Sequence, residues 1–155
     1  MRIARIVSGG QTGADRAALD AAIEHGRAYG GWCPAGGWAE DLPDPPGLLS
    51  RYPGLRETPS ADPAERTRLN VRDSHATLVV GGGPGLSRGS DVTVETAVRL
   101  GRPYLLVDDT DAVRDWLASL GRELTVNVSG PRESERPGVY VLARGLLGAV
   151  LRPGA

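Results

Sequence analysis

The sequence predicts an α/β fold with a mostly parallel sheet, and two observations support that prediction. Apolar runs of strand length alternate with helix-length segments from one end of the chain to the other. Glycine-rich loops follow several of these runs, as they do where parallel strands lead into helices. The 155 residues fit one domain, since domains usually contain about 100–200 residues. We therefore expect residues 1–155 to form a single three-layer, Rossmann-like domain that binds a ligand.

The first predicted elements are a strand over residues 3–8 and a helix over residues 17–25, joined by a glycine-rich loop. Thr12 or Asp15 is expected to cap the helix, and Gly26 is expected to end it. Small side chains on one helix face should allow close packing against the sheet: Ala14, Ala17, Ala18, Ala21 and Ala22.

Residues 29–60 show no clear periodicity, residues 30–38 and 43–47 are predicted to be loop, and a short strand is expected somewhere in residues 50–58. The segment is rich in aromatic rings: Tyr29, Trp32, Trp38 and Tyr52. Such rings either stack on a flat ligand as part of a movable cover or bury the loop itself, and both interpretations stay open. For a cover, Trp32 and Trp38 are the candidate rings, and Trp32 is preferred because the glycines before it and the proline after it form a tight bend.

The second half of the chain alternates regularly between predicted helices and strands. Asp62 and Pro63 are expected to start a helix that runs to about Ser74. Asp111 is expected to cap a later helix, which Gly121 ends. The other predicted elements are strands at 76–80, 103–107 and 124–128, a helix at 90–100, and a final helix from about residue 137.

The composition excludes several classes of protein. The formal net charge is −1, which argues against a basic protein that coats nucleic acid. All 18 basic residues are arginine, so Schiff-base chemistry and a P-loop lysine are excluded. The single cysteine rules out an internal disulfide, and His25 and His75 lack metal-ligand spacing, so no metal site is expected. No apolar run reaches the ~18–20 residues of a membrane span, and we expect a cytoplasmic protein.

Three loops that contain glycine are candidates for a phosphate site: residues 9–16, 81–90 and 129–134. Each follows a predicted strand and leads into a helix, whose first amides lack partners within the helix and attract anions. Each also carries an arginine that can hold phosphate with two hydrogen bonds: Arg16, Arg88 or Arg132. The alternative is that the glycines only turn the chain. The first loop is not a G-x-G-x-x-G fingerprint, which makes NAD a poor candidate.

Other polar side chains have two interpretations each. Arg66, Asn70 and Asp73 fall on one face of a predicted helix, and that face either is solvated or lines a crevice. Glu95 lies early in a later helix, where it is either a general acid–base group or a carboxylate favoured by the helix N-terminus. Cys33 is expected to be a buried apolar residue rather than a nucleophile.

Several motifs, in this order along the chain, resemble those of a known family. They are SGGQTGADRAALD at 8–20, GGWCP at 30–34, AED at 39–41, ETPS at 57–60, ERT at 65–67, NVRDS at 70–74 and NVSGPRES at 127–134. They are similar to motifs of the molybdenum cofactor carrier family, which belongs to the Rossmann-like nucleotide-binding superfamily that includes the cytokinin-activating phosphoribohydrolases. The chain departs from the family pattern where a longer insertion, residues 81–86, precedes Arg88-Gly89-Ser90 in place of a Gly-Gly-Thr motif.

The resemblance implies a non-catalytic carrier that binds molybdenum cofactor or another phosphorylated pterin or purine, with no covalently attached cofactor. We expect a small-molecule ligand, a homo-oligomer and molybdenum-cofactor enzymes as partners, but neither nucleic acid nor a membrane. Two alternatives stay open, a nucleotide N-glycosidase that uses Glu95 and a nucleotide-sensing module. The residues expected to bind ligand are Gly9, Gly10, Gln11, Thr12, Gly13, Arg16, Trp32, Asn70, Asp73, Arg88, Gly89, Ser90, Gly130 and Arg132.

Overall fold

The structure, a computed structural model, describes residues 2–82 and 88–152, and for Arg88 it describes the backbone alone. Five parallel strands form the central sheet in the order β2-β1-β7-β5-β6. Strand β7 is the last in the chain, yet it lies in the middle of the sheet between β1 and β5. The strands are β1 (Arg2–Val7), β2 (Ala28–Gly30), β5 (Ala76–Val79), β6 (Tyr104–Leu106) and β7 (Glu123–Ser129).

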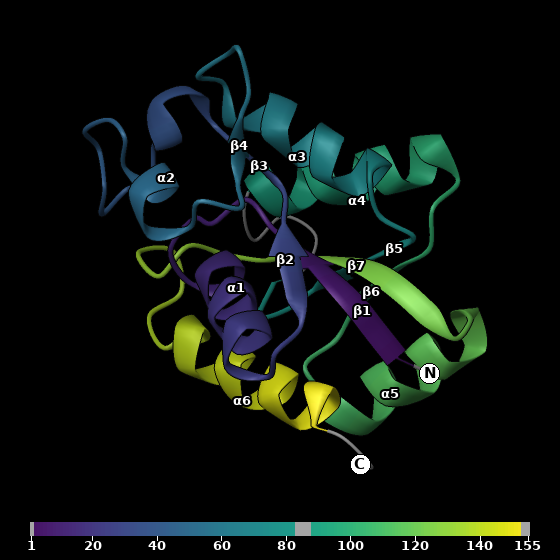
Figure 1. Ribbon diagram of the computed structural model, residues 1–155. Coiled ribbons are helices and arrows are strands. Elements are labelled where there is room, and N and C mark those ends of the chain that lie inside the picture. Colours follow the sequence, from purple (N-terminus) through teal and green to yellow (C-terminus); the bar gives the residue numbers. More distant parts are fainter. Residues whose placement is uncertain (1, 83–87, 153–155) are drawn as a thin grey trace.

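Helices cover both faces of this sheet (Figure 1). One face is covered by α1 (Ala14–Glu24), α5 (Thr110–Leu120) and α6 (Val139–Leu151), and the other by α3 (Pro63–Arg72) and α4 (Arg88–Leu100). A parallel sheet buried on both faces is what the alternating pattern predicts, so the expected three-layer, Rossmann-like α/β fold is confirmed. Within the described residues, no helix is both long and apolar enough to cross a membrane.

The main core lies between the sheet and helices α1, α5 and α6. The alanine face predicted for the first helix is confirmed, because all five of its alanines are 0 % exposed. Val113 and Leu117 of α5 and Ala143 and Leu147 of α6 belong to the same buried cluster. Since the alanines are small, α1 can pack closely against both the sheet and α6.

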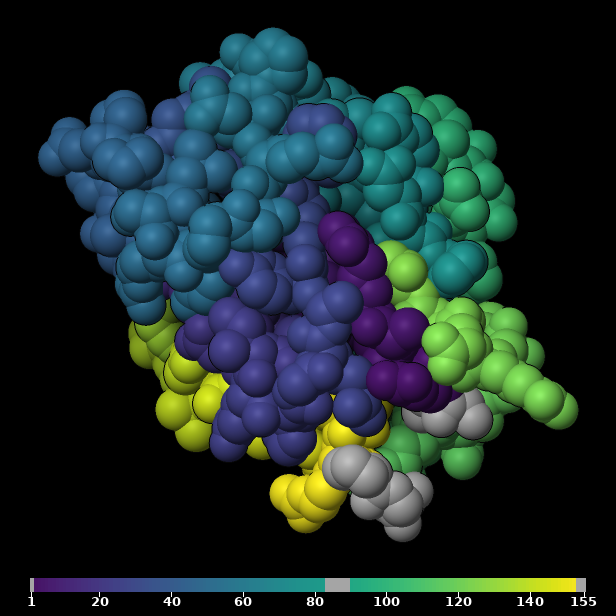
Figure 2. Space-filling model, in the orientation of Figure 1, coloured from purple at the N-terminus to yellow at the C-terminus, as the bar shows by residue number. Residues whose placement is uncertain are grey.

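We call residues 29–57 the aromatic segment. A second apolar cluster lies between this segment and α1. Leu19 of α1 packs there against Cys33, Leu48 and Tyr52. The segment contains β3 (Trp32–Cys33), a short 3-10 turn (Ala35–Gly37), α2 (Leu48–Arg51) and β4 (Arg56–Glu57). In Figure 2 its residues, coloured blue to teal, cover the upper left of the molecule.

The loop predicted for residues 43–47 is confirmed, whereas the loop predicted for residues 30–38 is wrong in part. Strand β2 adds an edge strand to the main sheet, and β3 pairs with β4 in a separate two-stranded parallel sheet. These strands have only 2 or 3 residues, too few to show a period, and pairing with distant residues holds them in place. The short strand expected in residues 50–58 is confirmed as β4.

The start of α1 differs from the prediction. Gly13 is the N-cap, and no side chain caps the helix. The Thr12 hydroxyl instead donates to Glu40 and accepts a hydrogen bond from the Glu133 amide. Asp15 turns into the protein and pairs with an arginine of another helix. The prediction of Thr12 or Asp15 as the cap is therefore wrong, because both side chains are used in contacts between loops and helices. Gly26 follows the end of α1 with a positive φ of 65°, as predicted.

The other predicted helix ends are mostly confirmed. Asp62 caps α3 with its carboxylate, and Pro63 is the first helical residue. Gly121 follows the end of α5. At the start of α5, Asp109 is the N-cap, and its carboxylate accepts a hydrogen bond from the Asp111 amide. The predicted cap, Asp111, is therefore wrong by two residues.

Candidate functional site

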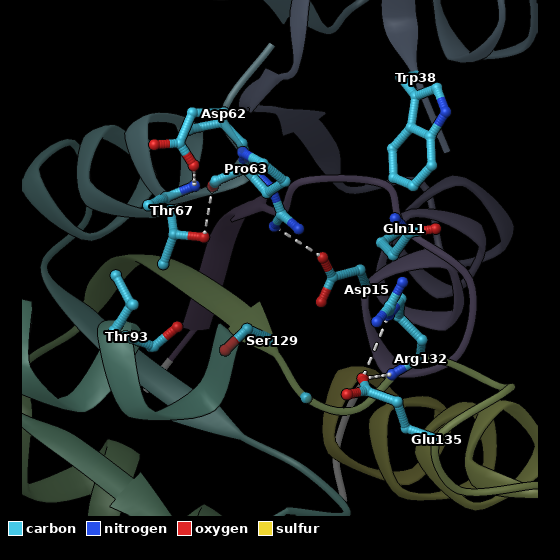
Figure 3. A pocket seen from close by; sticks show the side chains of 14 residues that line it. Gln11, Asp15, Trp38, Asp62, Pro63, Thr67, Thr93, Ser129, Arg132 and Glu135 are labelled. Atoms are coloured by element: carbon cyan, nitrogen blue, oxygen red, sulfur yellow. Dashed lines mark hydrogen bonds and ion pairs between the residues drawn. The ribbon is translucent and has the colours of Figure 1, made fainter. Parts of the chain in front are cut away.

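A cavity of about 270 Å³ opens at the carboxyl-terminal edge of the sheet (Figure 3). Strands β1, β7 and β5 are neighbours, so the segments that leave them meet at this edge. After β1 the chain continues to β2 at one edge of the sheet, and after β5 it continues to β6 at the other edge. In open parallel sheets, ligands bind where neighbouring strands connect in opposite directions in this way. The lining residues are Gln11, Asp15, Trp38, Asp62, Pro63, Ala64, Arg66, Thr67, Val92, Thr93, Ser129, Gly130, Arg132 and Glu135.

Asp15 is the buried acid of the cavity. The residue is 2 % exposed, and its Oδ2 lies 3.1 Å from Nη1 of Arg66 on α3. Burial raises the pKa of Asp15 to about 6, and the charge of Arg66 offsets only part of that effect. The Arg66 guanidinium passes directly over Gly9, where a Cβ would lie 2.2 Å from Nη1. A side chain at position 9 would therefore displace the arginine that faces Asp15.

Three buried polar atoms on the lining residues have no hydrogen-bond partner among the described residues: Asp15 Oδ1, Arg66 Nε and Ser129 Oγ. Buried polar atoms are almost always paired in folded proteins, because an unpaired one costs about 1–3 kcal/mol. Within the described residues, buried nitrogens of Arg27, Arg102 and Arg144 also lack partners away from the cavity, whereas the cavity brings an unpartnered acceptor, donor and hydroxyl together.

Arg132 lies at the side of the cavity, on the segment that follows β7. Its Nε lies 3.4 Å from Glu135 Oε1, and its Nη1 lies 3.8 Å from Glu40 Oε1. The side chain remains 42 % exposed. A partly exposed arginine in loose ion pairs can exchange a carboxylate for a phosphate group at little cost.

Glu40 ties the loop segments of the site together. Its carboxylate accepts hydrogen bonds from Thr12 Oγ1 and, at 2.6 Å, from Ser134 Oγ. Burial alone would raise the pKa of Glu40, but hydrogen bonds from Ser134 and Thr12 and the charge of Arg132 hold it below its ordinary value. The aromatic segment is thus fastened to the loops after β1 and β7, which fixes the shape of the cavity.

Arg16, expected at a phosphate, is instead part of the framework. Its Nη1 and Nη2 donate to the two oxygens of Asp41 at 2.9 and 2.8 Å, and its Nε donates to the Gly10 carbonyl at 2.9 Å. Its side chain is only 7 % exposed. Arg16 is not among the residues that line the cavity, so it holds the first loop to the aromatic segment.

Trp32, Asn70 and Asp73 also lie away from the cavity. The Asn70 amide pairs with the Trp32 backbone, accepting from its N–H at 2.8 Å and donating to its carbonyl at 3.0 Å. The Trp32 indole donates to Asp73 at 2.9 Å, and Arg56 lies over the ring. These contacts join α3 to β3. The aromatic ring that does line the cavity is Trp38, from the same segment.

The remaining predicted residues are distributed as follows. Gln11 and Gly130 line the cavity. The amide oxygen of Gln11 accepts from the backbone N–H groups of Thr12 and Glu40, which fixes its orientation. Arg88, Gly89 and Ser90 form the first turn of α4, Ser90 is buried, and the Arg88 side chain lies outside the described residues. Residues 83–87 of the predicted second loop also lie outside them.

Glu95 is exposed on α4 and does not line the cavity. Among the residues that the structure describes, no three His, Cys, Asp or Glu side chains are grouped to hold a metal ion. Sequence reasoning missed Asp15, which it considered only as a cap, and Ser129. The helical spacing of Arg66 to Asn70 was the available signal for Arg66, but only Arg66 of that face reaches the cavity.

Cys33 is buried in the second cluster, where burial, followed by the charge of Glu57, raises the pKa of its thiol to about 11. Because the thiolate is the reactive form, we expect the folded protein to react with a thiol reagent ~100-fold more slowly than the urea-unfolded chain at pH 7.5. Absorbance at 412 nm after addition of dithionitrobenzoate measures both rates. Equal rates would show that the aromatic segment opens freely.

A family model for the circularly permutated YpsA SLOG family matches residues 6–151. The chain belongs to that family. A solved structure of a "putative molybdenum carrier protein" from Syntrophus aciditrophicus SB is 38 % identical to this SLOG protein and superposes with a TM-score of 0.87. The match covers 97 % of this chain and 96 % of the other, which confirms the resemblance predicted from the motifs. No curated protein matches the chain.

Proposed function

We propose that this SLOG protein binds a phosphorylated heterocycle in the cavity at the edge of its sheet and carries it without turning it over. The observation that supports this most directly is the set of three unpartnered polar atoms around the cavity, Asp15 Oδ1, Arg66 Nε and Ser129 Oγ. The name of the Syntrophus relative suggests molybdenum cofactor, a pterin with a phosphate group, as the ligand.

The residues around the cavity fit such a ligand. The cavity volume of about 270 Å³ is slightly below the ~300 Å³ at which typical ligand pockets begin, which suits a bicyclic ring with its phosphate outside. Trp38 offers a ring face for stacking, and Asp15 and Ser129 offer polar contacts. Arg132 is exposed enough to hold the phosphate, and we include the start of α4, Arg88-Gly89-Ser90, in the proposed phosphate site because helix N-termini favour anions.

The hydrolase alternative receives no support from this geometry. It requires Glu95 beside the ligand, whereas Glu95 is exposed and absent from the cavity lining. Incubation with nucleoside monophosphates is expected to release no free base. Release of base that Glu95→Gln abolishes would overturn the carrier proposal.

The ligand itself can be sought in the purified protein. Native mass spectrometry of freshly prepared material is expected to show a bound species whose mass identifies a phosphorylated pterin or purine. Calorimetry with GMP and with neopterin monophosphate tests the same class of ligand directly. Failure of both compounds to bind would contradict the proposed function.

Arg132→Ala is expected to weaken the binding of a phosphorylated heterocycle ~10-fold or more, the range for a hydrogen bond to a charged group. The matched control is Arg2→Ala, which removes the same charge at the opposite, amino-terminal end of β1. Calorimetry at two salt concentrations measures both variants. Equal affinities of Arg132→Ala and the control would remove Arg132 from the site.

Glu135→Gln should have the opposite effect. Glutamine keeps the hydrogen bond that Glu135 Oε1 accepts from the Arg132 amide at 2.9 Å, but it no longer competes for the guanidinium. We expect tighter binding of the phosphorylated ligand by severalfold. Weaker binding would mean that Glu135 itself contacts the ligand.

We further propose that the protein acts in the cytoplasm as a homo-oligomer and delivers its ligand to molybdenum-cofactor enzymes. Val98, Leu100 and Tyr104 are exposed where α4 ends and the edge strand β6 begins, and exposed apolar side chains near an open strand edge favour self-association. Light scattering coupled to size exclusion measures the oligomeric state.

A further inference from the structure

We propose that the Asp15 carboxylate recognises a heterocycle edge with two adjacent N–H donors, the 2-amino-oxo edge that guanine and pterin share. This inference rests on the proposed function, because it assigns the ring specificity of the same cavity. It predicts that the protein discriminates against rings whose corresponding edge carries an acceptor, such as xanthine and lumazine.

The two carboxylate oxygens of Asp15 are in different states. Oδ2 accepts from Arg66 at 3.1 Å, while Oδ1 is buried without a hydrogen-bond partner in the described part of the chain. In Figure 3 the Asp15 carboxylate points toward the interior of the cavity, which Gln11 and Ser129 also line. Each oxygen of an ionised carboxylate can accept two hydrogen bonds, so a ligand can use Oδ1 and the second lone pair of Oδ2 together.

The Arg16–Asp41 pair in the same protein shows what a purely structural pair looks like. There both carboxylate oxygens accept from the two terminal nitrogens of the arginine, at 2.9 and 2.8 Å. Asp41 is partly exposed, so it would tolerate a free oxygen, whereas Asp15 is 2 % exposed and leaves one unused. An arrangement that left Oδ1 unpaired without a ligand would lose stability for no gain.

The charge around Asp15 suits a neutral donor pair. Arg66 of α3 and the backbone N–H groups of Gln11 and Gly130 face the carboxylate, and all three favour its ionised, acceptor-only form. Asp62, Arg132 and Glu135 are the other charged side chains that line the cavity. An ionised carboxylate offers no donor, so a ring edge that presents a carbonyl oxygen to it is repelled.

The experiment compares rings that differ at this edge and at the ring nitrogen beside it, which is protonated in the 2-oxo compounds. GMP and XMP differ by a 2-amino group in place of a 2-oxo group, and pterin and lumazine differ in the same way. At pH 7.5 we expect the wild type to bind GMP and pterin ~10- to 100-fold more tightly than their oxo partners, as for loss of a charged hydrogen bond.

Asp15→Asn tests the assignment to the residue. Asparagine replaces one acceptor by a donor, so the variant should lose affinity for GMP and gain it for XMP, which reverses the order. The matched control is Asp62→Asn, which makes the same exchange in the same cavity and keeps a good helix cap. The control should keep the wild-type preference.

Equal affinity of the wild type for both members of each pair would overturn the inference and leave the proposed function standing. So would an equal loss of GMP and XMP binding in Asp15→Asn, which is the result expected for a purely structural residue. If the wild type bound none of the four rings, the proposed function would fail and the inference with it. The wild-type preference does not depend on how well the variant folds.

Discussion

Between pH 4 and pH 8, the free energy of unfolding of Asp15→Asn is expected to rise relative to that of the unliganded wild type by ~2.5 kcal/mol. The pKa of Asp15 is raised from 3.8 to about 6, because burial disfavours the charged form more than Arg66 favours it. The ionised carboxylate therefore destabilises the folded state above about pH 6. That penalty shrinks as the pH falls toward 3.8 and is absent below it.

Asparagine has the shape of aspartate but does not ionise, so the variant lacks this pH dependence. Other carboxylates act in the opposite direction. Hydrogen bonds from Arg16 and Arg72 lower the pKa values of Asp41 and Asp73, so the stability that these groups contribute is lost as the pH falls through those lowered values. Both proteins share these contributions, and the difference between them isolates Asp15.

Urea unfolding of both proteins at intervals of one pH unit gives the difference curve. It should climb between pH 4 and pH 7 and then stay level. A flat curve would show that Arg66 fully compensates for the burial of Asp15. If the curve climbs as expected, the free protein tolerates an unfavourable carboxylate, which is the usual sign of a residue kept for binding rather than for stability.

The sheet and the position of the cavity could be predicted because they follow from local patterns. Strands alternating with helices require a parallel sheet, and the carboxyl ends of parallel strands lie at one edge. The loops after β1, β7 and β5 were therefore expected to share that edge, and residues of the loops after β1 and β7, namely Gln11, Gly130 and Arg132, line one cavity there. The order of the strands and helices along the chain is therefore enough to predict where the cavity lies.

The partners of individual side chains could not be predicted. Arg16 was expected at a phosphate because it lies at a helix start, but Asp41, 25 residues further on, binds it. Trp32 was expected to cover the ligand, but its backbone N–H and its indole N–H donate to Asn70 and Asp73. Both outcomes depend on how the aromatic segment folds, and its strands of 2 or 3 residues have no periodic signal. Asp15 was missed for a related reason, since burial of a charged residue is visible only in three dimensions.

Gly13→Ala is expected to lower the free energy of unfolding by ~4 kcal/mol and the melting temperature by about 10 °C, from strain and overpacking together. Gly13 has a φ of 81°, which side chains rarely adopt. A Cβ there would lie 2.4 Å from the Pro131 carbonyl oxygen and 2.9 Å from the Glu133 amide nitrogen. Both are backbone atoms of the segment after β7, so neither can rotate away.

Two further glycine variants separate the causes. Gly26→Ala introduces backbone strain without a steric clash, because φ is 65° and no atom lies within 4 Å of the added Cβ. We expect its free energy of unfolding to fall by ~1–2 kcal/mol. Gly145→Ala in α6 introduces neither backbone strain nor a steric clash. Because alanine favours the helix more than glycine does, the variant should be more stable by ~0.5–1 kcal/mol. Thermal and urea unfolding rank the three variants. If Gly13→Ala is no less stable than Gly26→Ala, the loops after β1 and β7 are not in close contact. If it is far less stable and also loses GMP binding, that contact holds the two loops that line the cavity.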